Sequence, residues 1–405
     1  MQNIVIDKPY EFVPPHRGTF WHALLQVYLR RYLRRHFGIE RVECRGQELL
    51  RQSIDAGHGV LLTPNHSRDC DPLVLGELAR CVGKPFFFMA SWHVFMQGRF
   101  MAWLLRRAGA FSIYREGMDR ASVNAATEIL ETAERPLVIF PEGVASRTNY
   151  HLNALLDGTA LIARSAAKKR GKAQPSGKVV VHPVAIHYHF HGGVERALCP
   201  VLDDIESRLT WQPQRHLPLI ERIYKLGEAL LSLKEVECLG RAQAGTIRER
   251  IERLTDHLLA PLEDEWARGD HDGHIVARVK RVRTAILPDL VKGEIAEAER
   301  QRRWRHLADV YLAQQLSHYP PDYVRVNPTP ERLLETVERF EEGITDAARV
   351  HRPMSATVEV APAIEVNPTR ESRGATDPLM SNVEQELRRM LGIASIGVEA
   401  QSAAA

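Results

Sequence analysis

The chain has 405 residues, a length that fits either two domains or one large domain with an appendage. Hydrophobic residues make up 44% and charged residues 26%, which are ordinary values for a globular protein and exclude global disorder and a polytopic membrane protein. A formal net charge of +3 is too small for a typical dedicated nucleic-acid-binding protein, so we expect no nucleic-acid partner.

The cysteines indicate a reducing compartment. They are five in number and scattered, and no C-x-x-C occurs, which argues against a disulfide framework or a thiolate zinc site. The first 15 residues carry acids and prolines without an apolar core, and no run of 18 apolar residues follows. We therefore expect a cytoplasmic protein that meets a membrane, if at all, from its surface.

Residues 1–40 predict an extended arm followed by a basic amphipathic helix. Leu25, Leu29 and Leu33 recur at helical spacing between Thr19 and Phe37, and no acid occurs between Glu11 and Glu40. Such a helix is typical of a segment that lies on a membrane, and equally of a helix that packs on its own domain and shows water a basic face. Residues 1–120 contain 17 Lys or Arg against 11 Asp or Glu, so the positive charge gathers in this part of the chain.

Residues 41–204 alternate short β-rich runs with helical stretches, a pattern typical of an α/β domain. We expect a mixed, largely parallel sheet flanked by helices, with the chemistry in loops at strand ends. The predicted strands are Val60–Thr63, Phe86–Met89, Phe111–Tyr114, Leu137–Phe140 and Val179–Tyr188. The predicted helices are Asp71–Val82, Gly98–Ala108, Arg120–Glu134 and Asn153–Lys168.

Residues 205–350 predict an all-helical C-terminal extension of unknown role, without further strands and without an internal repeat. Residues 351–405 predict a linker or disordered tail, because 351–377 is rich in Pro, Ser, Thr and Glu and shows no periodicity. A short helix is expected within this tail, at Pro378–Leu391. The helices expected before the tail are Leu219–Leu233, Thr246–Trp266, Gly273–Ile286, Val291–Ser317 and Pro330–Ala348.

The most informative local pattern is His66 at a strand end with Asp71 five positions later, at the start of a predicted helix. Asp71 can accept from one imidazole nitrogen and fix the tautomer, which leaves the other nitrogen to take a proton from a substrate hydroxyl. This is a base and its orienting acid without an enzyme nucleophile. Asp71 at a helix start also fits a simple capping role.

Three further blocks lie along the chain after residue 71. Glu142 and Gly143 stand in FPEGVASR after the strand LVIF, which suits a polar contact or a plain turn. Arg115 ends GAFSIYR, where an arginine suits phosphate binding or a surface salt bridge. The run VHPVAI is a buried-type strand interrupted by a proline, which indicates an edge or a bulge.

These four blocks, in the order in which they occur along the chain, resemble the glycerolipid acyltransferase family, which includes the lysophosphatidic acid acyltransferases. NHSRDCD is similar to the family's N-H-x-x-x-x-D block, and FPEGVASR to its F-P-E-G-T-x-S-R block. GAFSIYR and VHPVAI are similar to its two weaker blocks, G-x-x-x-x-x-R and V-P-V-x-I. The resemblance spans about residues 55–190 and leaves the helical region after 205 without a counterpart.

The resemblance implies an acyltransferase in which His66 is the general base and Asp71 orients it. The acceptor would be a lysophospholipid such as 1-acyl-glycerol 3-phosphate, and its hydroxyl would attack a thioester of acyl-CoA or acyl carrier protein directly, without an acyl-enzyme. No cofactor beyond that co-substrate, and no metal, is implied. The implied substrate-binding residues are Asn65, Arg115, Glu142, Gly143, Ser146 and Arg147.

Two departures from the family pattern bear on the acceptor. Val144 stands where the family often has Thr, and Tyr114 stands where it often has Asp. Both changes leave the His66–Asp71 pair intact, so a glycerophospholipid headgroup other than lysophosphatidate is also compatible with the sequence.

A second segment, residues 86–111, predicts contact with lipid. It combines Trp92, Phe100 and Trp103 with Arg106 and Arg107, and aromatic plus basic side chains suit the headgroup level of an anionic membrane. An ordinary core helix with a basic exposed face is the alternative. We therefore expect a peripheral protein at the inner face of a membrane, with protein partners left open.

Two rival functions remain from the sequence. The chain can be a membrane-associated scaffold whose acyltransferase-like domain binds lipid without turnover. It can also be a metal-dependent hydrolase that uses His187, His189 and His191, since H-x-H-x-H is able to bind a metal.

Overall fold

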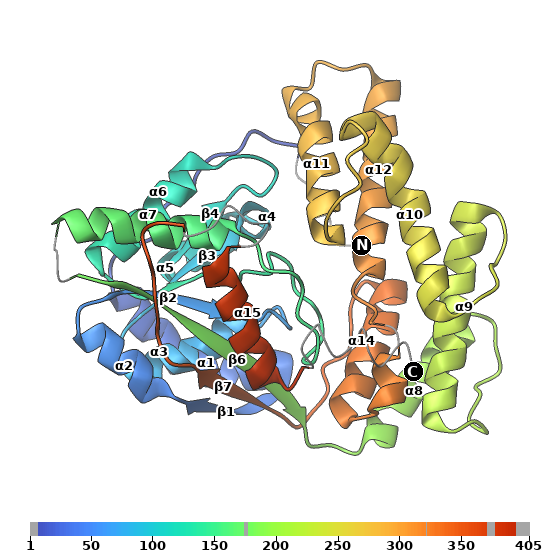
Figure 1. Ribbon diagram of the computed structural model, residues 1–405. Helices are drawn as coiled ribbons and strands as arrows, with labels where there is room; N and C mark the ends of the chain where they lie inside the picture. The colour runs from blue at the N-terminus through green and yellow to red at the C-terminus, as the bar shows by residue number, and fades with distance from the viewer. Residues whose placement is uncertain (1–6, 174–176, 321, 371–376, 394–405) are drawn as a thin grey trace. The chain divides into compact units, whose positions relative to one another are not determined.

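The computed structural model describes residues 7–173, 177–320, 322–370 and 377–393, and these fall into two compact units (Figure 1). The α/β unit comprises Glu11–Tyr114, Asp119–His191 and Val350–Ala405. The helical unit comprises Met1–Tyr10, Arg115–Met118 and Gly192–Arg349. Each unit is thus assembled from segments that are distant in sequence.

The α/β unit is built on an eight-stranded sheet with the order β1-β7-β6-β2-β5-β3-β4, and β8 pairs with β6 beside this path. The pairs from β6 through β2, β5 and β3 to β4 are all parallel, as is β1 with β7. β7 and β8 run antiparallel to β6. The strands are β1 Ile39–Arg45, β2 Gly59–Pro64, β3 Phe87–Ser91, β4 Ala110–Ile113, β5 Leu137–Val138, β6 Val179–Phe190, β7 Met354–Val360 and β8 Ile364–Glu365. The predicted mixed, largely parallel sheet is therefore confirmed.

Helices cover both faces of this sheet, as expected for strands that are buried on both sides (Figure 1). One group is α1 Phe20–Phe37, α2 Gln47–Asp55 and α3 Asp71–Val82, and the other is α6 Arg120–Thr132, α7 Gly158–Ala173 and α15 Pro378–Leu391. The second group shares one core with the strands, in which Ile129, Ala163 and Val383 pack with Phe87 and Leu137. The short helices α4 Trp92–Phe95 and α5 Arg99–Arg107 connect β3 to β4.

The predicted linker at 351–377 is wrong over its first part. Met354–Val360 alternates buried and half-buried side chains and forms β7, an inner strand of the sheet between β1 and β6. Strands therefore do not stop at residue 205. The helix expected at Pro378–Leu391 is confirmed as α15, and residues 371–376 of the expected linker lie outside the described residues.

The helical unit contains seven helices in the part that the structure describes. Helices α9 to α12 share one hydrophobic core, which includes Leu231, Leu259, Ile286 and Val310. The predicted helix Val291–Ser317 joins the end of α11 to α12, which are separated by a turn at Gly293. The helices are α8 Val194–Arg208, α9 Leu219–Leu239, α10 Ile247–Trp266, α11 Ile275–Lys292, α12 Glu297–Leu316, α13 Tyr323–Val326 and α14 Pro330–Thr345.

A repeated polar contact ties successive helices of this unit together. In the α8–α9 hairpin, buried Glu206 accepts from the backbone N–H of Gln214 and from Arg222, at 2.9 Å each. In the α9–α10 hairpin, Glu235 makes the same two contacts with Gln243 and Arg250, again at 2.9 Å.

The α10–α11 hairpin repeats the arrangement with one substitution. Buried Glu263 pairs with Arg278 at 2.8 Å, and the imidazole of His271 takes the place of the backbone N–H, at 2.9 Å. Each glutamate thus lies eight positions before its loop partner, and fifteen or sixteen before its arginine. The expectation of no internal repeat is therefore wrong for these helices.

Candidate active site

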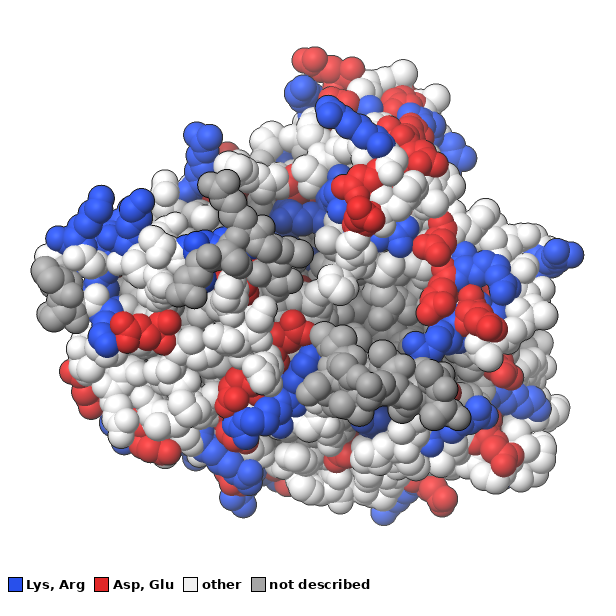
Figure 2. Space-filling view, in the orientation of Figure 1, with Lys and Arg blue, Asp and Glu red and all other residues white. Residues whose placement is uncertain are grey.

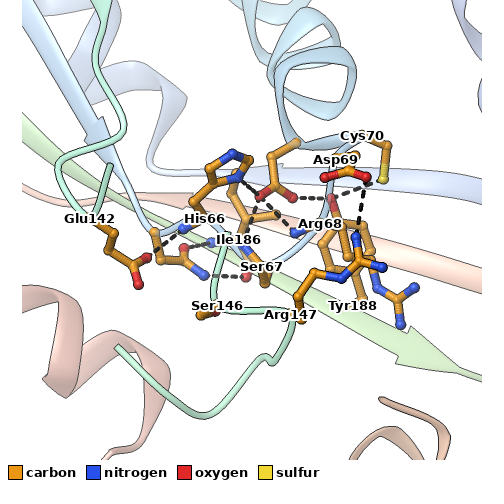
Figure 3. Close-up of polar contacts among 12 residues, drawn as sticks. His66, Ser67, Arg68, Asp69, Cys70, Glu142, Ser146, Arg147, Ile186 and Tyr188 are labelled. Carbon is orange, nitrogen blue, oxygen red and sulfur yellow. Dashed lines mark hydrogen bonds and ion pairs between the residues drawn. The ribbon is translucent and has the colours of Figure 1, made fainter. Parts of the chain in front are cut away.

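His66 and Asp71 form the center of a polar cluster at the carboxyl end of β2. Figure 3 shows His66 among its neighbours. The Nδ1 atom of His66 lies 2.8 Å from Oδ2 of Asp71. The Asp71 side chain is fully buried, while 21% of the His66 side chain is exposed. No hydrogen bond engages Nε2 of His66 within the part of the chain that the structure describes. The buried acid therefore holds one imidazole nitrogen, and the other is available to a substrate.

The loop itself wraps around the Asp71 carboxylate. The backbone N–H groups of Ser67 and Arg68 donate to Oδ2 of Asp71, at 2.8 and 3.0 Å. Asp71 is the first residue of α3, and the hydrogen bonds described for its side chain run to the His66 loop and to Tyr188. The carboxylate thus serves the His66 loop rather than the helix end, which decides between the two interpretations of the motif.

The second oxygen of Asp71 is bound by a residue that the sequence motifs do not contain. The hydroxyl of Tyr188, on β6, donates to Oδ1 of Asp71, and the Cys70 sulfur lies 3.4 Å from the same hydroxyl. Burial, followed by the nearby Asp71 charge, raises the pKa of Tyr188 well above its ordinary value. Tyr188 therefore stays protonated and acts as a donor.

Glu142 fastens the loop after β5 to the His66 loop. Its Oε1 accepts from the backbone N–H of His66 at 2.7 Å, and its Oε2 accepts from the backbone and side chain of Asn153 at 2.8 and 2.9 Å. Burial raises the pKa of Glu142 to about 7, against the opposing effect of these N–H donors and of His66. Glu142 thus holds the backbone of His66 in place, and its two carboxylate oxygens point to protein N–H groups.

Asn65 and Asn149 continue the sheet where β2 has ended. The side chain of Asn65 accepts from the backbone N–H of Ile186 at 2.7 Å and donates to its carbonyl at 3.1 Å. Asn149 makes the same pair of bonds with the backbone of Tyr188, at 3.0 and 2.7 Å. Each amide thereby replaces a neighbouring strand along β6 and fixes a loop of the candidate site to it.

Gly143, Ser146 and Arg147 shape the loop that faces His66. Gly143 has a φ of +71°, and a Cβ added to it would lie 2.7 Å from Leu156, so a glycine is required there. The backbone N–H of Ser146 donates to the carbonyl of His66 at 2.6 Å. Arg147 reaches Asp69 at 3.2 Å and stays partly exposed. Of these three, Arg147 presents a charged side chain at the surface of the site (Figure 3).

Arg115 is the predicted site residue that the structure groups with the helical unit. It follows β4 and neighbours Glu116, which forms a buried ion pair with Arg283 of α11. Burial, together with the charge of Arg283, lowers the pKa of the Arg115 guanidinium to about 10, against the opposing charge of Glu116. The other predicted residues gather around His66 in the α/β unit.

His187 and His189 of β6 lie on the strand face opposite Tyr188, as alternation along a strand requires, and His191 follows directly after the strand. His189 contacts Thr357 at 3.2 Å and His191 contacts Ser355 at 2.7 Å, both on β7. Among the described residues, no group of three or more His, Cys, Asp or Glu is placed to hold a metal ion.

Sequence reasoning missed Tyr188, Asn149 and Asn153, because each acts across the fold rather than within a motif. A period-two pattern in VVVHPVAIHYHF offered one clue, since it sets Tyr188 on the face opposite His187 and His189. Nothing local to Asn149 or Asn153 distinguishes them from ordinary loop residues.

Comparison with known protein families assigns a part of the chain. The model of the family described as Acyltransferase matches residues 41–187, a range that contains the His66–Asp71 pair, Glu142 and the start of the histidine run. Curated protein sequences gave no match to the chain. Residues 41–187 are therefore an acyltransferase domain of the family that includes the glycerolipid and lysophosphatidic acid acyltransferases.

Proposed function

We propose that this protein transfers a fatty acyl group from acyl-CoA, or from acyl carrier protein, to a hydroxyl of a lysophospholipid such as 1-acyl-glycerol 3-phosphate. The observation that carries the proposal is the 2.8 Å contact between Nδ1 of His66 and buried Asp71, beside a partly exposed imidazole. The acyltransferase domain gives the class of reaction, and the site is suited to an alcohol as acceptor.

In this mechanism Nε2 of His66 takes the proton of the acceptor hydroxyl as its oxygen attacks the thioester carbonyl. The tetrahedral intermediate then releases the thiolate, which recovers the proton from His66, and an ester and a free thiol result. Cys70 is a poor nucleophile for a rival covalent route, because burial raises the pKa of its thiol to about 12. Direct attack by the acceptor therefore fits the site better than an acyl-enzyme.

Arginines are the groups that suit the acceptor phosphate. Arg147 presents a partly exposed guanidinium beside the His66 loop, where Asp69 holds it at 3.2 Å. Arg115 has a lowered pKa, and an anionic ligand would stabilise its charged form. We assign Arg147 to phosphate recognition, because a guanidinium can bind a phosphate through two parallel hydrogen bonds. For Arg115, which belongs to the helical unit, phosphate binding stays the prediction made from the sequence.

The lipid substrates suggest that the α/β unit works at an anionic membrane surface, with membrane lipids as its partners. Leu29 and Leu33 of α1 pack inward, while a second apolar stripe of the same helix faces outward. This outward stripe consists of Phe20, Leu24, Val27, Tyr28 and Tyr32.

Helix α5 adds to the same surface. Trp103 of α5 packs edge-on against Trp21 of α1 with ring centroids 4.9 Å apart, and the neighbouring Phe100 is 72% exposed. Arg107 lies over both tryptophan rings. Exposed aromatic side chains next to arginines are typical of contact with phospholipid headgroups. Among the helices of the described residues, none is both long and apolar enough to cross a bilayer.

The test is an acceptor panel. Purified protein is incubated with palmitoyl-CoA and vesicles that contain lysophosphatidate, other lysophospholipids or none, with glycerol 3-phosphate as a soluble acceptor. Free thiol is followed, and the lipid product is identified by mass spectrometry. The proposal predicts thiol release that requires an acceptor and matches new ester in amount. Vesicle binding without turnover for any acceptor would instead identify a lipid-binding scaffold.

A further inference from the structure

The Tyr188 hydroxyl shares the Asp71 carboxylate with His66. Oδ2 of Asp71 accepts hydrogen bonds from Nδ1 of His66 and from the backbone N–H groups of Ser67 and Arg68. Oδ1 of Asp71 accepts a hydrogen bond from the Tyr188 hydroxyl. Both residues of this carboxylate–phenol pair are fully buried, so each bond replaces water that cannot reach the site.

Tyr188 is itself held firmly on β6. Asn149 binds both backbone groups of Tyr188 on one side of the strand, and β7 pairs with it at Ala356 on the other. The guanidinium of Arg68 lies over the tyrosine ring, 5.3 Å from its centroid. The phenol oxygen therefore has a fixed position, from which it fixes the carboxylate.

We propose that Tyr188 is a positioning residue for acyl transfer: its hydroxyl sets the rotation of the Asp71 carboxylate and limits how strongly Asp71 accepts from His66. The effect on turnover rests on the proposed function, whereas the effect on the His66 imidazole does not. The thiol of Cys70, which stays protonated, can donate to the phenol oxygen and complete a chain from Cys70 through Tyr188 to Asp71.

Removal of the phenol has a defined electrostatic consequence. Without it, Oδ1 of Asp71 is buried and unpaired, so the carboxylate becomes a stronger acceptor toward Nδ1 and favours the protonated imidazole. Among the described residues, the other charged or titratable groups near His66 are Glu142 beneath it, Arg68 and Asp69 on its loop and Arg147 from the loop after β5, and the substitution removes none of them. A base that holds its proton more tightly is inactive up to a higher pH.

The decisive variant is Tyr188→Phe, with Tyr323→Phe as its matched control. Tyr323 is also buried and also donates to a buried carboxylate, that of Glu335 at 2.6 Å, but it lies in the helical unit. Both variants lose one buried phenol–carboxylate bond. A general loss of stability will therefore appear in both, and a change at His66 in Tyr188→Phe alone.

Two readouts separate the inference from the proposed function. In the thiol-release assay, Tyr188→Phe should lower kcat on the order of tenfold with little change in KM, and the acidic limb of the pH–rate profile should move to higher pH. In the absence of substrate, diethyl pyrocarbonate should modify His66, because only the neutral imidazole reacts. The acidic limb of that modification, followed on the His66 peptide by mass spectrometry, should move in the same direction.

A second variant tests the direction of the pH shift and keeps the buried ring in place. Site-specific 3-fluorotyrosine at position 188 keeps the ring and strengthens the donor, so it should move the acidic limb to lower pH. Modification profiles that coincide for wild type, Tyr188→Phe and the fluorinated protein would overturn the inference, as would an equal shift in Tyr323→Phe. Shifted modification profiles in a protein without any turnover would support the positioning of His66 and refute the proposed function alone.

Discussion

At the scale of single residues, the candidate site combines one partly exposed group with several buried ones. The imidazole of His66 is partly exposed, whereas Asp71, Glu142 and Asn65 are buried and hydrogen-bond to the His66 loop or to β6. The family motifs therefore contain both a group that can react and groups that hold the loops in place. We assign proton transfer to His66, and loop geometry to the buried members of its two specific blocks.

Asp71→Asn tests the orienting role. The amide presents either an N–H that opposes Nδ1–H of His66 or an oxygen without the negative charge that stabilises the imidazolium, so the reactive tautomer is lost or weakened. We expect kcat to fall by about 10² to 10⁴, the usual contribution of a general base, with folding retained by circular dichroism. Asp55→Asn, at an exposed position of α2, is the control and should keep wild-type turnover.

Glu142 gives the protein a characteristic pH dependence of stability. Its pKa is raised from 4.5 to about 7, so across that window the folded state holds a proton that the unfolded state has released. The free energy of unfolding should therefore fall as pH rises from 5 to 7.5, by up to about 3 kcal/mol for this residue. Denaturant titrations should show a smaller fall in Glu142→Gln, and an unchanged slope in that variant would contradict the assignment.

At the scale of elements, the helical hairpins depend on buried Glu–Arg pairs. Glu235→Ala should destabilise the protein by about 3–5 kcal/mol, because it leaves the Arg250 charge buried without its partner. Lys234→Ala, which breaks the exposed pair with Glu237, is the control and should change stability by less than about 1 kcal/mol. Urea unfolding measures both. Equal effects of the two variants would show that the repeated contact adds little.

The sequence predicts most elements of the fold, and its failures have physical causes. The helices Asp71–Val82 and Pro378–Leu391 begin and end as predicted, because a proline at the start and a glycine at the end mark them. β7 was missed because proline and threonine content outweighed the alternation in MSATVEV. The repeated contact of the helical hairpins was missed because the glutamate and the arginine of each pair are fifteen or sixteen positions apart. The sequences of the three hairpins share little else.

The sequence predicts the local part of the candidate site and misses the contact made across the fold. His66 and Asp71 are close in sequence, so their contact follows from the motif. Tyr188 is 117 positions from Asp71 and reaches it only through the order of strands β2 and β6, which no local pattern contains.

At the scale of the whole molecule, charge and apolar surface are distributed unevenly. Acidic and basic side chains are interspersed over α10 to α12 on the face shown in Figure 2. Basic residues dominate the N-terminal part of the chain, where α1 and α5 expose aromatic side chains between arginines. This distribution suits a lipid-facing role for the α/β unit.

Membrane association is testable at one exposed residue. Phe100→Asp should weaken binding to vesicles that contain phosphatidylserine, because it places a negative charge among apolar side chains and anionic lipids. Leu161→Asp on α7, also exposed and apolar, is the control. Vesicle sedimentation should show weaker binding for Phe100→Asp only, and a further loss for wild type at high salt. Equal binding by the two variants would rule out this surface.

The measurement that tests the central claim most directly is thiol release by His66→Ala. Wild type and variant are compared with the same acyl-CoA and with the lysolipid that gives wild type its highest rate. Loss of the base should reduce acceptor-dependent thiol release by about 10² to 10⁴, in a variant that unfolds at a temperature close to that of wild type. Thiol release by a folded His66→Ala protein at the wild-type rate would contradict His66 as the general base.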